Sequence, residues 1–163
     1  MKRLQDAPPS YWQAPGEEAY KNDRLREYQD LLRQRGLTDT SVLRLLTAQL
    51  LQENGALSEN RDGDHGCSIG IPQRNTCNYT DPVTRRRFNA KTFRVRYPSW
   101  NDWRYQLSWM ADKTAWAFEH YHRDIRLTII SHNSPAAAAR GSDTKAGYYR
   151  QIVARSSLLT TSL

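Results

Sequence analysis

Residues 41–55 read SVLRLLTAQLLQENG, an apolar segment that ends on the carboxylate of Glu53 and opens into a polar, glycine-rich loop. Apolar residues stand three, seven, eight and eleven positions before that carboxylate: Leu50, Leu46, Leu45 and Val42. This spacing is typical of one face of a helix. It therefore predicts a helix that carries Glu53 on the last turn of its buried face.

A carboxylate in that position is partly desolvated and lies at the negative end of the helix dipole. Both effects penalise the ionised form, so we expect the pKa of Glu53 to be raised. A carboxylic acid that stays protonated near neutral pH can serve as a general acid. The alternative is a solvated glutamate at a helix end, if the buried face is shifted by one position.

Length and composition bound the fold. The chain has 163 residues, enough for one compact domain, and its five Trp and nine Tyr supplement a hydrophobic content of 38%. No stretch approaches the roughly 20 apolar residues that span a bilayer. Residues 1–9 have basic side chains with no apolar core after them, unlike a secretory signal. We expect a globular, water-soluble protein without a transmembrane segment.

The net charge is +7, from 24 basic and 17 acidic residues. A basic surface attracts polyanions, which include nucleic acid, anionic lipid and the anionic bacterial envelope. The alternative is a basic surface that only keeps the protein soluble. No cofactor is indicated.

Two cysteines, Cys67 and Cys77, bracket a loop in which the chain must reverse. We expect them to lie close enough to bridge, and a disulfide would stabilise the fold by roughly 2–3 kcal/mol. Two reduced thiols are equally compatible with the sequence. A zinc site with His65 lacks a fourth ligand, and Asp62-Gly63-Asp64 lacks the later glutamate of a calcium loop. We therefore expect no metal.

Secondary structure is predicted from the periodicity of apolar residues and from the capping and turn residues between the periodic segments. A helix from an N-cap at Asp39, Thr40 or Ser41 to Glu53 precedes a loop over 54–87 with at most short hairpin strands. Residues 93–97 alternate apolar and basic side chains and predict one strand. The other expected helices cover 16–35, 103–121, 124–131 and 147–154. The fold class is mainly α (α+β).

The chain resembles the lysozyme-like superfamily, in particular the goose-type lysozymes and the soluble lytic transglycosylases. Four motifs carry the resemblance in the right order: Glu53-Asn54-Gly55, Ser68-Ile69-Gly70-Ile71-Pro72-Gln73, Ser131-His132-Asn133-Ser134-Pro135 and Tyr148-Tyr149-Arg150-Gln151-Ile152-Val153. They cover roughly residues 40–155. Asn54, Pro72 and His132 depart from the residues typical of the family, so the subfamily is open.

The resemblance implies a helical catalytic domain over residues 38–156, with a small loop or β-hairpin wing beside a cleft. Residues 1–37 would form an N-terminal arm and amphipathic helix, and residues 157–163 a flexible tail. The implied substrate is the peptidoglycan glycan strand, cut at its β-1,4 bond between N-acetylmuramic acid and N-acetylglucosamine. The implied place of action is the periplasm or cell wall. Without a signal peptide, delivery would need a phage virion, holin-type release or a secretion system.

Each motif has a chemical role in that reaction. Glu53 would protonate the leaving oxygen. Gly70 would let backbone approach a sugar ring, and the amides of Gln73 and Asn133 would bond acetamido groups or orient the acid. Ser68, His132 and either Tyr148 or Tyr149 complete the implied substrate-binding set. The alternative for these polar residues is ordinary loop, cap and core packing.

A second carboxylate decides the product. Asp62 and Asp64 lie nine and eleven residues after Glu53, where a lysozyme would hold a water-activating aspartate. With either one in place, water attacks and the enzyme is a hydrolase. Without one, Glu53 takes a proton from the muramyl 6-hydroxyl and a 1,6-anhydro sugar forms, which is the transglycosylase route that we favour.

Two other functions compete with this one. Arg85, Arg86, Arg87, Arg94 and Arg96 interleave with Phe88, Phe93 and Tyr97, as in a nucleic-acid-binding surface. That reading leaves the Glu53 loop unexplained, so we expect no nucleic-acid partner. The other is a catalytically silent piece of a larger assembly, docked to a virion or secretion machine through residues 1–37.

Overall fold

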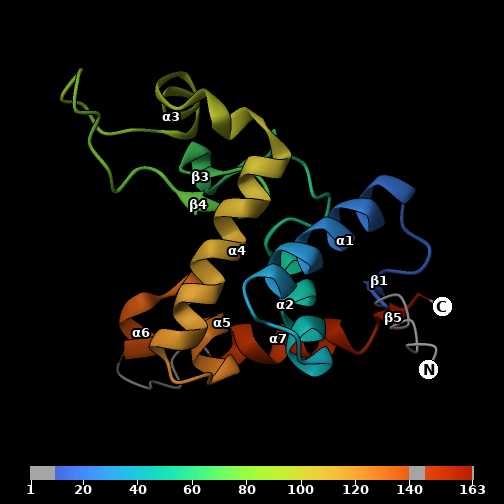
Figure 1. The fold of residues 1–163 in the computed structure, drawn as a ribbon. Coiled ribbons are helices and arrows are strands. Elements are labelled where there is room, and N and C mark those ends of the chain that lie inside the picture. The colour runs from blue at the N-terminus through green and yellow to red at the C-terminus, as the bar shows by residue number, and fades with distance from the viewer. Residues whose placement is uncertain (1–9, 140–145, 163) are drawn as a thin grey trace, which may run out of the picture.

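The computed structural model describes residues 10–139 and 146–162. The helices are α1 (Ala19–Gln34), α2 (Thr40–Glu53), α3 (Ala90–Arg96), α4 (Trp103–His120), α5 (Ile125–Asn133), α6 (Pro135–Ala139) and α7 (Ala146–Ser156). Two 3-10 turns, η1 (Asp64–Gly66) and η2 (Pro98–Asn101), lie between them. The strands are short: β1 (Trp12–Gln13), β2 (Asp62–Gly63), β3 (Ser68–Ile69), β4 (Arg74–Asn75) and β5 (Thr160–Thr161). A mainly helical chain with small antiparallel sheets confirms the expected fold class (Figure 1).

Helix α2 begins and ends as the sequence predicts. The Asp39 carboxylate accepts a hydrogen bond from the backbone N–H of Val42 at 3.0 Å, which caps the first turn. Leu46 and Leu50 are fully buried on the same face. Leu45 and Val42 are only half-buried, so the buried stripe is rotated slightly from the predicted one but still leads to Glu53.

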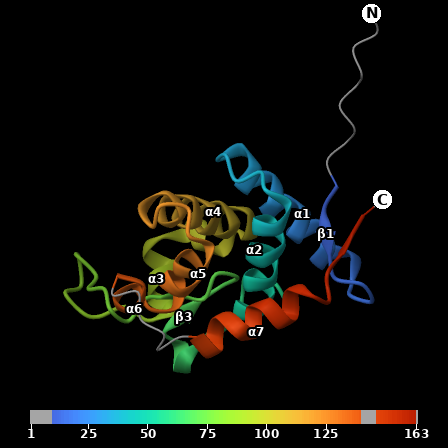
Figure 2. The ribbon, with the colours of Figure 1, turned by 90° about the horizontal axis from the view of Figure 1, so that it is seen from below.

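Most helices pack into one aliphatic core, which we call the body. Leu25 and Leu32 of α1 share this core with Leu46 of α2 and Leu107 of α4, so α1 is an integral part of the body. Helix α7 lies beside α2 (Figure 2) and contributes Ile152. Across the described ranges, no helix is both long and apolar enough to cross a membrane.

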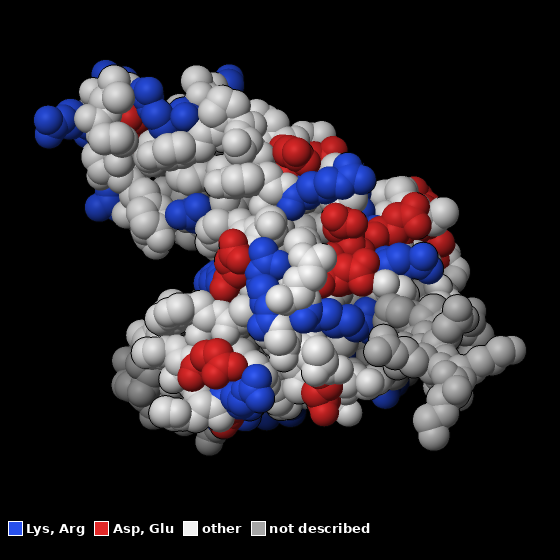
Figure 3. Space-filling model, in the orientation of Figure 1, with Lys and Arg blue, Asp and Glu red and all other residues white. Residues whose placement is uncertain are grey.

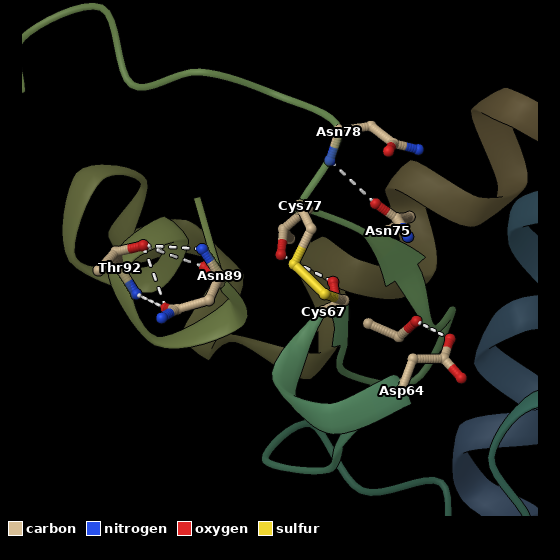
Figure 4. Close-up of a disulfide and its surroundings, with 9 residues drawn as sticks. Asp64, Cys67, Asn75, Cys77, Asn78, Asn89 and Thr92 are labelled. Atoms are coloured by element: carbon tan, nitrogen blue, oxygen red, sulfur yellow. Dashed lines mark hydrogen bonds between the residues drawn. A yellow bond between two sulfur atoms is a disulfide. The ribbon is translucent and has the colours of Figure 1, made fainter. Parts of the chain in front are cut away.

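A smaller region, residues 60–102, projects from the body, and we call it the wing (Figure 1). Its sheet has the order β2-β3-β4, with Asp62 opposite Ile69 and Ile69 opposite Arg74. Cys67 and Cys77 form a disulfide with Cα atoms 5.2 Å apart (Figure 4). The expectation that they lie within bridging distance is confirmed. Their sulfurs bond each other and are therefore not zinc ligands.

The predicted strand at 93–97 is wrong, because residues 93–96 belong to helix α3 and Tyr97 is its C-cap. Asn89 caps the helix by accepting from the Thr92 N–H at 2.8 Å, and the Thr92 hydroxyl accepts from the Asn89 N–H at 3.0 Å (Figure 4). Phe93 and Tyr97 are four residues apart and therefore share one helical face, with ring centroids 4.9 Å apart. In so short a segment, alternating apolar and basic residues are compatible with the period of a helix as well as with that of a strand.

The prediction of a flexible tail at 157–163 is also wrong for the residues that the structure describes. Leu159 is buried in the body core, and Thr160–Thr161 pair antiparallel with Trp12–Gln13. The Ser162 N–H donates to the Tyr11 carbonyl at 2.8 Å. Residues 1–9 and 163, which the predicted arm and tail include, lie outside the described residues.

Candidate active site

A cleft of about 610 Å³ separates the wing from α5 and α6, with α4 at its back. Figure 3 shows it as the deep notch in the left side of the surface. The predicted site residues that line it are Glu53, Asp64, Ser68, Gln73, His132 and Asn133. Segments far apart in sequence thus meet in one cleft.

Glu53 lies on the final turn of α2 and is largely shielded from solvent. The Tyr148 hydroxyl donates a hydrogen bond to its Oε1 atom. Burial is the main influence and raises the pKa of the Glu53 carboxyl, and the charge of Asp64 acts in the same direction. The Tyr148 hydrogen bond and the ammonium of Lys113 lower that pKa and partly offset burial. The net raised pKa agrees with the expectation from the sequence.

The sequence left open which tyrosine meets the acid, and the structure places Tyr148 there. Gln49 Nε2 donates to the Tyr148 hydroxyl at 3.3 Å and to the Ile129 carbonyl at 3.1 Å. Burial, then the charge of Glu53, raises the pKa of Tyr148, so the phenol keeps its proton and acts as a donor. Tyr149 packs instead against the cluster that contains Ile130.

His132 is held by two polar contacts. Its Nε2 atom lies 2.8 Å from the Pro72 carbonyl oxygen, which can only accept, so Nε2 carries the proton. Nδ1 is then an acceptor for the Lys113 ammonium at 2.9 Å. Burial and the charge of Lys113 lower the pKa of His132 to about 3, so the ring is neutral. The 3.8 Å approach of Nε2 to Glu53 is therefore no ion pair.

Lys113 completes the polar floor of the cleft. Burial is the first cause that lowers its pKa, to about 8, and the charge of Arg74 adds to it. Glu53 opposes this shift. Lys113 therefore remains largely charged at neutral pH and supplies a cation near Glu53.

The two aspartates have different surroundings. The Ser68 hydroxyl donates to Asp64, and both residues line the cleft. Asp62 pairs with Arg94, whose Nη2 lies 2.7 Å from Oδ1, and it does not line the cleft. Of the two predicted second acids, only Asp64 faces the site.

Gly70 and Gln73 hold the wing together. Gly70 is buried with φ +67°, and a Cβ atom there would lie 2.3 Å from Gln106 Oε1. Close packing against Gln106 thus requires this glycine, which does not line the cleft. Gln73 Nε2 donates to the carbonyls of Gly70 at 2.8 Å and Arg61 at 3.0 Å, so its amide nitrogen already has partners.

Sequence reasoning missed several residues of the cleft, among them Arg74, Trp109 and Lys113. Trp109 and Lys113 are one helical turn apart on α4, and the Lys113 Nζ atom lies 5.3 Å from the indole centroid. They directly precede Met110 and Thr114, which lie on the buried, mainly apolar stripe of α4. A lysine directly beside an apolar stripe was the available signal.

Of the three aromatic residues in the basic segment of the wing, Tyr97 alone is exposed. Phe88 and Phe93 are buried, and Arg94 and Arg96 form ion pairs with Asp62 and Asp81. The exposed basic side chains that remain there are Arg85, Arg86, Arg87 and Lys91. This arrangement does not favour the alternative of base stacking.

The arrangement can transfer a proton. The desolvated carboxyl of Glu53 lies close to a phenol donor and an ammonium. Separately, no cluster of three or more His, Cys, Asp or Glu suited to a metal occurs in residues 10–139 and 146–162. Comparisons with protein-family models, with curated proteins and with solved structures give no match for this chain.

Proposed function

We propose that this protein is a peptidoglycan-cleaving enzyme with a lysozyme-like fold, acting on the β-1,4 bond between N-acetylmuramic acid and N-acetylglucosamine. One observation carries the proposal: the cleft contains a carboxyl, Glu53, whose pKa burial raises and whose orientation Tyr148 fixes. A carboxyl with a raised pKa in a polar cleft suits protonation of a glycosidic oxygen.

In the proposed first step, Glu53 donates its proton to the leaving glycosidic oxygen as the bond to the muramyl C1 breaks. Positive charge develops on that sugar while Glu53 becomes a carboxylate. The Tyr148 hydroxyl and the Lys113 ammonium then stabilise the new negative charge.

In the second step, the Glu53 carboxylate takes the proton of the muramyl 6-hydroxyl, whose oxygen bonds to C1. The product is a 1,6-anhydro ring, and Glu53 returns to its protonated state without a water molecule. We favour this lytic transglycosylase route because one carboxyl, Glu53, whose pKa burial raises, can both give and take the proton.

Hydrolysis is the second candidate, since Asp64 lines the same cleft and accepts a hydrogen bond from Ser68. In that case Asp64 would activate a water molecule that attacks C1. The two routes differ in their products and in their dependence on Asp64.

The proposed substrate lies outside the cytoplasm. The Cys67–Cys77 disulfide fits such a place, because disulfides persist in oxidising compartments. We propose action in the periplasm or cell wall after delivery by a phage virion, holin-type release or a secretion system.

The test combines activity with product analysis. Loss of turbidity of a peptidoglycan suspension, with 1,6-anhydromuramyl ends in the mass spectrum, is the expected result. The Asp62→Asn/Asp64→Asn variant should retain turnover within about tenfold, because neither aspartate takes part in ring closure. Reducing ends, together with inactivity of that variant, would indicate a hydrolase. Absence of cleavage, with salt-dependent DNA binding in a parallel assay, would overturn the proposal.

A further inference from the structure

A second cavity of about 330 Å³ lies in the wing, and we call it the aromatic pocket. Its wall is made of rings, those of Tyr79, Phe88, Phe93, Tyr97, Trp100 and Tyr105. Arg74 and Tyr79 line both this pocket and the main cleft, so the two spaces adjoin. Nothing in the proposed reaction uses it.

The pocket has an apolar floor and a polar rim. Phe88, Phe93 and Trp100 are only 2–4% exposed, whereas the tyrosines are 41–50% exposed. The rings pack edge-on or tilted against one another, with centroids 4.9–5.8 Å apart. Such a pocket can take small aliphatic groups on its floor while tyrosine hydroxyls remain in contact with water.

Arg74 lies at the junction of the two spaces. Its guanidinium carbon is 5.2 Å from the Phe93 centroid, 5.3 Å from that of Trp100 and 4.8 Å from that of Trp109. Within residues 10–139 and 146–162, the Arg74 side chain forms no ion pair or hydrogen bond with the protein, unlike Arg94 and Arg96. Its nitrogens are also not among the buried polar atoms without a partner, so they reach solvent.

These features select an acidic ligand. A planar guanidinium, held by rings and open to solvent, matches the two oxygens of a carboxylate. A neutral sugar ring could stack on the aromatic rings, but it would leave the Arg74 guanidinium without a partner of opposite charge. The ligand should therefore combine a carboxylate with short aliphatic groups, and it should reach the pocket from the cleft.

We propose that the aromatic pocket binds the acidic stem peptide carried by the muramyl sugar, with Arg74 paired to a peptide carboxylate. The proposal rests on the proposed function, because the glycan strand in the cleft is what brings the peptide to the pocket. The stem peptide branches from the lactyl group, carries free carboxylates and is rich in alanine. The strand then occupies the cleft while its branch enters the wing.

The first test is binding without catalysis, measured by calorimetry. The probe is a soluble stem tripeptide with free carboxylates, and the comparison is the same peptide with amidated carboxyl groups. The free acid should bind at least about tenfold more tightly, the effect of one charge-assisted hydrogen bond. Arg74→Gln should remove that difference, while Arg87→Gln, an exposed arginine outside both cavities, should keep it. Equal binding of both peptides by the unmodified protein would overturn the proposal.

The second test is substrate preference. Cleavage rates are compared on peptide-bearing strands and on strands stripped of peptides by an amidase. The unmodified protein should prefer peptide-bearing strands by about tenfold, and Arg74→Gln should reduce that ratio to about one. Cleavage of both substrates at equal rates would refute the peptide site and leave the proposed function intact. Failure to cleave either substrate, with tight tripeptide binding, would refute only the proposed function.

Discussion

The body and the wing are stabilised in different ways. The body buries aliphatic side chains such as Leu46 and Leu50 between long helices, and it fixes Glu53 through α2 and Tyr148 through α7. The wing has two-residue strands, a cluster of rings around Phe93 and Trp100, and one disulfide. The proposed acid thus belongs to the body, and much of the proposed substrate surface belongs to the wing.

This difference has an energetic reason. Strands of two residues are too short to be stable alone, and aromatic pairs contribute only about 0.5–1.5 kcal/mol each beyond area burial. The wing therefore depends on its cross-link and on ion pairs such as Arg94–Asp62. The comparison predicts that changes in the body alter chemistry, whereas changes in the wing alter local order and substrate binding.

The largest effect is expected from Glu53→Gln. The substitution preserves volume and an oxygen that can accept from Tyr148, but it removes the transferable proton. Loss of a general acid costs about 10²–10⁴-fold in rate. The measurement is turnover of purified peptidoglycan, with circular dichroism to establish that the variant is folded. Near-normal activity in a folded variant would end the assignment of Glu53.

The same variant tests the burial of Glu53 through stability. Because the pKa of Glu53 is raised in the folded protein, the unfolded chain loses this proton first as pH rises. At pH values above the ordinary pKa of a glutamate, the Glu53 carboxyl therefore lowers the free energy of unfolding. Glu53→Gln should raise the melting temperature at pH 7 and raise it less at pH 4. An equal shift at both values would contradict the desolvation of the carboxyl.

The next effect should be confined to the wing. Replacing Cys67 and Cys77 by Ser should lower stability by about 2–3 kcal/mol, the chain-entropy value for a loop of this length. Amide hydrogen exchange should quicken in β3 and β4 while α2 stays protected. Uniformly faster exchange throughout would show that wing and body unfold as one unit, and the comparison would fail.

A smaller effect is expected from Tyr148→Phe. Losing the hydroxyl removes the donor to Glu53 and should lower turnover by about tenfold, as for one hydrogen bond to a charged group. Tyr149→Phe is the matched control, since the Tyr149 ring packs beside Ile130 and the hydrogen bond to Glu53 comes from Tyr148. Equal losses in the two variants would show that packing, and not the hydroxyl, matters.

The smallest effect concerns pH. Lys113 lowers the pKa of Glu53, so removing its charge in Lys113→Met should raise that pKa. The first step needs protonated Glu53, and the alkaline limb of the rate profile should therefore move to higher pH. Arg87→Met serves as the control, because that exposed arginine lies outside the cleft. If the alkaline limb does not move, the charge of Lys113 has no influence on the pKa of Glu53.

Sequence reasoning predicted the body better than the wing. The helical period before Glu53 extends over many residues, so a small error of rotation left the acid on the correct face. The prediction for the wing depended on short segments. One of them, 93–97, fits the pattern of a strand as well as that of a helix. The capping pair Asn89 and Thr92 was the local signal for the helix.

The missed cleft residues have a physical explanation. Arg74 and Lys113 are defined as site residues by groups from other parts of the chain, the Phe93 ring beside Arg74 and the Glu53 carboxylate near Lys113. Sequence spacing does not encode such contacts. Gly70 illustrates the reverse case, because its constraint comes from Gln106 of α4 and not from a ligand.

The pairing of β1 with β5 also matters for handling this protein. Tyr11 and Ser162 are hydrogen-bonded neighbours, and β1 and β5 lie on the right of Figure 1, whereas the notch in Figure 3 opens on the left. Attachment to a bead or a carrier through either β1 or β5 should leave the notch unobstructed. A short linker between these strands should likewise allow circular permutation, with new ends cut into an exposed surface loop.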